Sequence, residues 1–166
     1  TAPNTTAPTA TSTTNSIVVT SAQTDVNSGI NASTRQYSIK KKSDSSWGSW
    51  VTDSSNTHTF TNLTLNTEYQ VRTQVKDVLG NGYAISGIKT ITTVNITKPT
   101  ITLSTTSPTN KSITATITYP EITGLTKQYS YDNKTWTTYT APLTIDTNKT
   151  IYARSIDSTN QGSDST

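Results

Sequence analysis

The sequence contains no cysteine and no methionine. The absence of cysteine excludes disulfides, thiolate catalysis and cysteine-ligated zinc, but leaves an extracellular location open. Because no methionine starts the chain, we expect a processed product or a part of a longer protein. No apolar run approaches the roughly 18 residues of a membrane helix, and no signal peptide is visible. We therefore expect no direct membrane insertion, and we expect any targeting or anchoring element to lie outside this segment.

Charge is also scarce, because only 14% of the residues are charged and the net charge is +3. The only basic run is Lys40, Lys41 and Lys42. Nucleic-acid-binding proteins concentrate basic residues on one face, so we expect no nucleic-acid partner. A short lysine run is more typical of a solvated strand edge, where it discourages edge-to-edge pairing.

Hydrophobic residues make up only 30% of the chain. Disordered chains share this property, but they also carry high net charge and few aromatic or β-branched residues. Here threonine is the commonest residue, and isoleucine, valine and tyrosine are spread along the whole chain. These four residue types favour strands because their side chains fit a pleated surface. The composition therefore predicts an all-β protein with a thin core.

Two segments show the alternation of a half-buried strand. In Glu68–Asp77 the apolar residues and threonine fall on one face, and Arg72 falls on the other. In Ser112–Tyr119 four apolar residues alternate with three threonines. A period of two is the pattern of a strand with one face in the core.

Further short alternations, separated by Gly, Asn, Asp and Ser clusters, predict the remaining strands. In the first half these are Ser16–Ala22, Arg35–Lys41, Ser49–Thr52, Thr57–Leu63 and Ile88–Val94. In the second half they are Thr100–Thr105, Lys127–Asp132, Thr137–Tyr139, Leu143–Ile145 and Thr150–Asp157. Residues 1–15 are rich in Pro, Thr and Ala and predict a linker that leads into a first edge strand.

The two halves repeat one pattern. Arg35–Ser38 and Lys127–Ser130 share the sequence Gln-Tyr-Ser after a basic residue. Each is followed by an Asp, a Trp and a second aromatic residue: Asp44, Trp47 and Trp50 in the first half, and Asp132, Trp136 and Tyr139 in the second. A later strand matches Tyr69–Thr73 to Ile151–Ser155, which aligns Arg72 with Arg154. A period of this length, about 85 to 90 residues, suits one small β-sandwich per copy.

These segments resemble known families. Leu63–Arg72 is similar to the turn and strand around the buried tyrosine of fibronectin type III domains. Gln128–Trp136, Tyr139–Pro142 and Thr150–Asp157 resemble bacterial Ig-like modules related to the C-terminal domain of chitobiases. The resemblance implies two tandem antiparallel Ig-like/fibronectin type III β-sandwiches.

The predicted domain organisation follows from the repeat and the resemblance. We expect the linker and first edge strand in 1–15, a fibronectin type III-like domain in 8–95 and a bacterial Ig-like domain in 96–166. The second domain stops where a last strand should still be forming, so we expect that strand to be incomplete.

The sequence offers little for catalysis. His58 is the only histidine, and no nucleophile elbow of the G-x-S-x-G type accompanies it. We expect His58 to lie on the solvent side of its strand, opposite Phe60. Glu68 and Glu121 are the only glutamates and lie in different halves, whereas a glycosidase needs two carboxylates across one cleft. We expect Asp77, Asp132 and Asp157 to cap turns, and no enzymatic activity.

Two binding sites remain as hypotheses. Trp47, Trp50 and Trp136 could stack on sugar rings, although a tryptophan that packs against each sandwich explains the same placement. Asp157, Asn160 and Asp164 crowd the end of the second half and offer the oxygen ligands that calcium prefers, without matching an EF-hand loop. A plain turn is the favoured explanation of these three residues, and no other cofactor is expected.

The resemblance implies a non-catalytic, extracellular structural or adhesive spacer pair from a larger bacterial surface or secreted protein. Its partners would be neighbouring modules of the same chain and a cell-surface glycan or protein. One alternative is a virion component, in a phage tail or as a capsid decoration. Another is a pair of accessory, carbohydrate-contacting domains of a secreted glycosidase.

Overall fold

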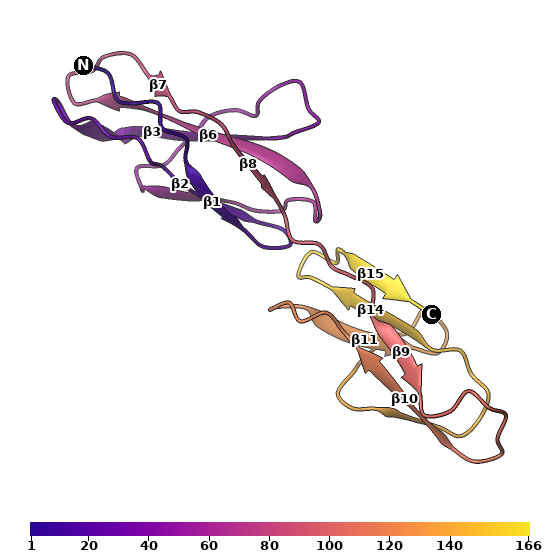
Figure 1. Cartoon of the computed structure of the whole chain (residues 1–166). Helices are drawn as coiled ribbons and strands as arrows, with labels where there is room; N and C mark the ends of the chain where they lie inside the picture. The colour runs from indigo at the N-terminus through magenta and orange to yellow at the C-terminus, as the bar shows by residue number, and fades with distance from the viewer. The chain divides into compact units, whose positions relative to one another are not determined.

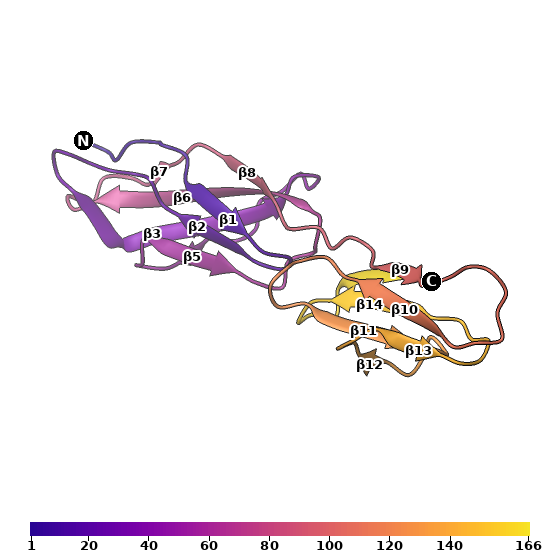
Figure 2. The same ribbon diagram turned by 60° about the horizontal axis from the view of Figure 1, so that its bottom comes forward.

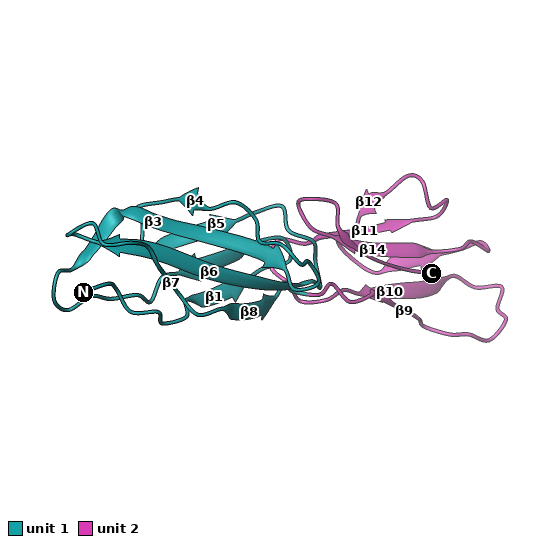
Figure 3. Ribbon diagram, turned by 90° about the horizontal axis from the view of Figure 1, so that it is seen from above, with its two compact units in different colours: residues 1–94 teal, residues 95–166 magenta.

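The computed structural model describes residues 1–166 and contains strands but no helix. It divides into two compact units, Thr1–Val94 and Asn95–Thr166, called unit 1 and unit 2 (Figure 3). No segment forms the kind of long, apolar helix that spans a lipid bilayer.

Unit 1 consists of two antiparallel sheets (Figure 1). The first sheet has the order β1-β2-β5, with β1 (Thr9–Ser12), β2 (Ile17–Thr20) and β5 (Thr57–Phe60). The second has the order β4-β3-β6-β7, with β4 (Val51–Thr52), β3 (Ile30–Lys41), β6 (Glu68–Asp77) and β7 (Ala84–Ile85). Strand β8 (Lys89–Thr92) also pairs with β6, so β7 and β8 together form one interrupted edge.

Unit 2 repeats this topology (Figure 2). One sheet has the order β13-β10-β9, with β9 (Thr100–Leu103), β10 (Ile113–Thr118) and β13 (Leu143–Ile145). The other has the order β12-β11-β14-β15, with β11 (Thr126–Ser130), β12 (Thr137–Thr138), β14 (Tyr152–Ile156) and β15 (Gly162–Ser165). In both units the first, second and fifth strands form one sheet, and the remaining strands form the other.

The observed strands match the predicted ranges best where one face of the strand is apolar. Glu68–Asp77 and Leu143–Ile145 are strands over the predicted residues. Strand β3 begins at Ile30, earlier than predicted, and its pairing with β6 shifts register between Asn31 and Gln36. Five residue steps on β3 oppose two on β6 there, and this irregular stretch of mostly polar residues has no apolar alternation, which is why the pattern did not reveal it.

Two strands were not predicted at all, β7 and β15. Strand β15 has the sequence Gly-Ser-Asp-Ser and contains no apolar residue, yet it pairs with β14 over four residues. A Cβ atom at Gly162 would lie 1.9 Å from the Ser155 carbonyl oxygen, so glycine permits the close approach of the two backbones. The last strand, which the sequence predicted to be incomplete, is therefore present in the second sheet.

Each unit has its own apolar core between its sheets. The core cluster of unit 1 consists of the buried residues Ile17, Val19, Tyr37, Tyr69 and Val71. That of unit 2 consists of the buried residues Ala115, Ile117, Tyr119, Ile145, Ile151 and Ala153. These small clusters explain how a chain with 30% hydrophobic residues forms two folded units.

Part of the unit 1 interior is polar instead of apolar. Gln23 and Thr73 are buried, and Thr73 Oγ1 donates a hydrogen bond of 2.9 Å to Gln23 Oε1. Gln23 Nε2 in turn donates to the carbonyl oxygens of Asn4 and Ala84, at 3.0 and 2.8 Å. Buried polar groups are tolerated when they are paired in this way. The network therefore ties the N-terminal segment to β6 and β7.

The chain enters and leaves unit 1 at opposite ends. The N-terminal segment lies near Thr24 and near the end of β6, whereas Val94 bonds to Thr13 and Asn66 near the start of β6. Strand β6 has ten residues, which corresponds to about 33 Å. The points where the chain enters and leaves unit 1 are therefore separated by the full length of its longest strands.

Unit 2 has the same property. Thr100 pairs with Thr118 at the end where the chain enters β9. Thr166 shares a surface groove with Leu103 and Thr150, at the other end of β9.

Candidate functional site

The tryptophans of unit 1 form a cluster with Arg72 on the outer face of the second sheet. Trp47 and Trp50 lie between β3 and β4, and the Arg72 guanidinium carbon is 4.0 Å from the centre of one ring and 4.7 Å from the other. Lys40 Nζ lies 5.6 Å from the centre of the Trp47 ring. A cation over an aromatic face stabilises by about 0.5–2 kcal/mol, more when water is excluded. Burial lowers the pKa of Arg72 from its usual value.

Backbone contacts fix the loop that carries these rings. The Gly48 N–H donates to the Ile39 carbonyl oxygen at 3.0 Å, and Ser38 Oγ donates to the Gly48 carbonyl oxygen at 2.9 Å. A Cβ at Gly48 would lie 2.7 Å from the Ile39 oxygen, so this position requires glycine. The loop is therefore folded back on β3, which brings Trp47 and Trp50 over Arg72.

Unit 2 contains a smaller version of the cluster. The Arg154 guanidinium carbon lies 4.1 Å from the centre of the Trp136 ring, and Arg154 Nε donates to Gln128 Oε1 at 2.8 Å. Asp132 shapes the loop before Trp136, because its Oδ1 accepts the N–H groups of Lys134 and Thr135 at 2.8 and 2.7 Å. These bonds hold the pKa of Asp132 well below its usual value.

The sheet registers of the two units differ although their sequences align. Tyr37 lies opposite Thr73. Its counterpart Tyr129 lies opposite Ala153. The sequence alignment matches Thr73 to Ser155, so the pairing in unit 2 is shifted by two residues. A shift of two residues keeps every side chain on its own face of the sheet. An arginine therefore meets a tryptophan in both units, but Arg72 lies opposite Ser38 and Arg154 opposite Gln128.

The clusters bear directly on the sugar-stacking hypothesis. Trp47, Trp50 and Trp136 are each partly buried, and each has an arginine guanidinium over its ring. A stacked guanidinium occupies one of the two ring faces on which a sugar could stack. The observed contacts support a role in packing, and carbohydrate binding at these residues stays a prediction.

The residues predicted to bind calcium lie in one turn and on the strand after it. The Asn160 N–H donates to the Asp157 carbonyl oxygen at 3.0 Å, and Asn160 has a positive φ of 59°. Asp157 Oδ1 accepts the N–H groups of Thr159 and Gln161. Asp164 lies on β15 opposite Arg154, while Asp157 follows the end of β14. The structure thus joins Asp157 and Asn160 in a turn but places Asp164 further along the sheet, and calcium binding stays a prediction.

The prediction for His58 was wrong. His58 and Phe60 are two residues apart on β5, so they share one face of the strand. The His58 side chain is only 18% exposed. It stacks on Tyr37 with ring centres 5.2 Å apart and contacts the Phe60 ring at 4.7 Å. Its Nδ1 lies 2.9 Å from Asp53 Oδ2. His58 is therefore a packed residue with a carboxylate partner.

Asp53 links this histidine to the turn that precedes β5. The hydrogen bond with His58, together with the N–H of Ser55, lowers the pKa of Asp53 to about 2. Tyr37 Oη donates to the Ser55 carbonyl oxygen at 2.8 Å, and burial raises the pKa of Tyr37 to about 12. The two shifts make the stability of unit 1 depend on pH at both ends of the scale.

We expect Asp53→Asn to remove part of the acid sensitivity of unit 1. A carboxyl group whose pKa falls on folding stabilises the folded state above its unfolded pKa of about 3.9. That stabilisation is lost as the pH falls through about 2. The variant should unfold at lower urea concentration than the wild type at pH 6, and the difference should shrink as the pH falls from about 4 and vanish only below about 2. Asp44→Asn, at an exposed loop position, is the matched control. A difference that stays constant with pH would contradict the assignment.

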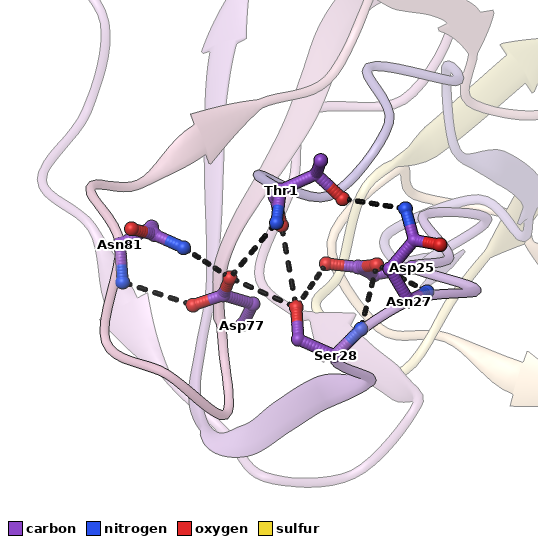
Figure 4. Close-up of polar contacts among 6 residues, drawn as sticks. All are labelled: Thr1, Asp25, Asn27, Ser28, Asp77 and Asn81. Atoms are coloured by element: carbon purple, nitrogen blue, oxygen red, sulfur yellow. Dashed lines mark hydrogen bonds and ion pairs between the residues drawn. The ribbon is translucent and has the colours of Figure 1, made fainter.

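A second group of polar residues surrounds Asp77 at the end of β6 (Figure 4). Asp77 is fully buried, and its Oδ1 accepts the N–H of Asn81 at 2.9 Å while its Oδ2 accepts Asn81 Nδ2. Ser28 Oγ lies 3.0 Å from Asp77 Oδ2 and 2.9 Å from Asp25 Oδ2. The N-terminal ammonium group is 4.0 Å from Asp77 Oδ2.

Burial alone would raise the pKa of Asp77, but the hydrogen bonds from Asn81 and Ser28 outweigh it and lower the pKa. Asp77 therefore caps its turn, as the sequence predicted, and also holds the loop before β3. The second of these roles joins residues 49 positions apart, which no local pattern reveals.

Comparison with known proteins gives matches among solved structures alone. No protein-family model matches the sequence, and no curated protein is significantly similar to it. Among solved structures, the whole chain aligns with the FN1–FN3 domains of chicken contactin (CNTN1) at 15% identity and a TM-score of 0.42, and it spans 65% of that chain. It aligns with a two-domain fibronectin type III segment of chicken tenascin at the same identity and TM-score, over 95% of that chain.

The strand order identifies the fold independently of these values. Two antiparallel sheets packed face to face, with the first, second and fifth strands in one sheet, are the arrangement of an Ig-like or fibronectin type III sandwich. The chain contains two of them. The all-β, tandem-sandwich prediction is confirmed.

Proposed function

We propose that the chain is a non-catalytic spacer that carries mechanical load between neighbouring parts of a larger extracellular protein. The observation that carries the proposal is the path of the chain through unit 1. It enters at one end of the sandwich and leaves at the other. A pull on the two ends is therefore applied along the strands.

The terminal segments of unit 1 are joined in the geometry that resists such a pull. The Gly87 N–H donates to the Thr5 carbonyl oxygen at 2.7 Å, and the Val94 N–H donates to the Thr13 carbonyl oxygen at 2.8 Å. Between them, Ser12 Oγ donates to the Thr92 carbonyl oxygen at 2.8 Å. The two segments run in the same direction, since higher residue numbers on one meet higher numbers on the other. Tension at the termini shears these bonds together instead of breaking them one by one.

The carboxylates also support a structural role. Asp25, Asp53, Asp77, Asp132 and Asp157 each accept the N–H of a residue two to four positions further along the chain. Such bonds fix turns by replacing backbone partners with a side-chain oxygen. Many of the carboxylate side chains of the protein therefore fix its turns and loops.

The proposal is tested by stretching single molecules with handles at both ends. We expect two separate unfolding events, one per unit. At about 3.6 Å per extended residue, and after subtraction of the folded length, unit 1 should release about 30 nm and unit 2 about 22 nm. A load-bearing pair should show both steps at distinct, reproducible forces.

Val94→Pro provides the sharper comparison, because proline removes the N–H that bonds to Thr13. We expect it to lower the unfolding force of the 30 nm step and to leave the 22 nm step unchanged. Extension of the wild-type chain without force peaks, or an equal force for the variant, would overturn the proposal.

The proposal also covers the kind of larger protein that contains the spacer. The resemblance of the first half to fibronectin type III domains and of the second half to bacterial Ig-like modules supports a surface or secreted protein outside the cell, with further modules of the same chain as neighbours. A virion protein built from the same sandwiches would meet the same mechanical demand. Recovery of the chain within purified virus particles would decide for the virion, and recovery from cell walls or culture medium would decide for the bacterial protein.

A further inference from the structure

The turn between β6 and β7 contains the only Asn-Gly pair of the sequence, Asn81-Gly82. Both residues are exposed, and nothing lies within 4 Å of where a Cβ of Gly82 would be. When glycine follows an asparagine, the glycine backbone nitrogen can attack the amide carbon of the asparagine side chain, because glycine has no side chain to shield that nitrogen. The question is whether the fold blocks this attack or leaves it possible.

Other turn asparagines of the chain are protected by hydrogen bonds. Those with positive φ are Asn62, Asn66, Asn133 and Asn160. In each case the N–H of the next residue is engaged, by the oxygens of Asn15, Thr93, Asp132 and Asp157 respectively. A bonded N–H is held away from the preceding side chain. By contrast, no hydrogen bond holds the Gly82 N–H.

We propose that Asn81 is a site of spontaneous deamidation that loosens unit 1 with age. The deprotonated Gly82 nitrogen attacks Asn81 Cγ and forms a C–N bond. The Cγ–Nδ2 bond breaks, and Nδ2 leaves as ammonia. Water then opens the resulting cyclic imide at either carbonyl carbon, which yields aspartate or isoaspartate at position 81.

The consequence follows from the contact between Asn81 and Asp77. Asn81 Nδ2 donates to Asp77 Oδ2, and Asp77 is fully buried. Deamidation replaces this donor by a second carboxylate, so a like charge faces the buried carboxylate of Asp77. Isoaspartate also lengthens the backbone of the turn by one atom. The N–H of residue 81 in this turn is bonded to Asp77. The new group therefore removes a partner from Asp77 and repels it.

The experiment is to age the purified full chain at 37 °C and pH 8.5 and to map its peptides by mass spectrometry. We expect the peptide containing Asn81 to gain the mass of an amide-to-acid exchange before any other asparagine peptide. The aged protein and a freshly made Asn81→Asp variant should both show a lower melting midpoint for unit 1, by about 5 °C or more. The transition of unit 2 should not move.

Two variants serve as controls. Gly82→Ala has room for its methyl group and no positive φ to strain, so it should fold normally and convert much more slowly. Asp77→Asn added to Asn81→Asp replaces the carboxylate pair by an amide and a carboxylate, and should recover part of the lost midpoint. Equal conversion in Gly82→Ala, faster conversion at another asparagine, or conversion without a change of midpoint would overturn the proposal.

Discussion

Replacing Val71 with aspartate is expected to unfold unit 1 while unit 2 stays folded. Val71 is fully buried at the centre of the unit 1 core and lies opposite Ile39 in the sheet. An unpaired carboxylate at this position loses its hydration without gaining a partner, which costs more than about 4 kcal/mol. A small domain has little more stability than this to lose. Circular dichroism should show partial loss of strand signal, with the emission of Trp47 and Trp50 shifted to longer wavelength.

The matched control is Gln70→Asp on the same strand. Gln70 points to the opposite face of β6 and lies between Lys40 and Thr90. We expect a change within about 1 kcal/mol, because the new charge stays hydrated next to a lysine. If both variants were equally harmless, the inward assignment of Val71 would be wrong. Arg72, which the sequence also placed on this outer face, is a poor control because it contacts two tryptophan rings.

Tyr37→Ala is expected to destabilise unit 1 by about 3–5 kcal/mol, as measured by urea unfolding. Tyr37 is fully buried, stacks on His58 and donates to the Ser55 carbonyl oxygen. The substitution removes the ring that supports His58 and leaves a cavity between the sheets. The loss should appear as a lower urea midpoint for unit 1 alone.

Tyr37→Phe separates the hydroxyl group from the ring. It keeps the packing and loses one hydrogen bond, so it should cost only about 1 kcal/mol at neutral pH. Because the folded protein raises the pKa of Tyr37 to about 12, wild-type stability should fall as the pH rises from about 10, where the unfolded chain ionises. The phenylalanine variant should lose less stability over this range. An equal loss in both proteins would contradict the shift assigned to Tyr37.

The strongest predictions from the sequence concern strands with one apolar face. The alternation in Glu68–Asp77 and in Ser112–Tyr119 identified β6 and β10, because a strand half buried in a core must show this period. Strands β7 and β15 gave no such pattern. Their pairing depends on backbone hydrogen bonds, which every residue except proline can donate.

The candidate sites likewise have features that the sequence predicted and contacts that it did not. The sequence singled out Trp47, Trp50 and Trp136 as aromatic residues in matched positions, and it aligned Arg72 with Arg154. It did not predict that these arginines cover the rings, because each arginine lies on a strand that is distant in sequence from the loop of its tryptophan. His58 was misplaced by the assumption that residues two apart alternate, whereas they share a face.

The sequence by itself determined that this protein has two copies of one all-β design with small cores. Composition, alternation and the repeated Gln-Tyr-Ser and Trp segments are local properties, and they are visible without coordinates. Only the tertiary structure decided the register of each sheet, the arginine–tryptophan contacts and the bonding of Asn81 to the buried Asp77. Each of these depends on which distant backbone atoms pair across a sheet or turn. A register shift of two residues leaves the hydrophobic pattern unchanged, so the pattern carries no information about it.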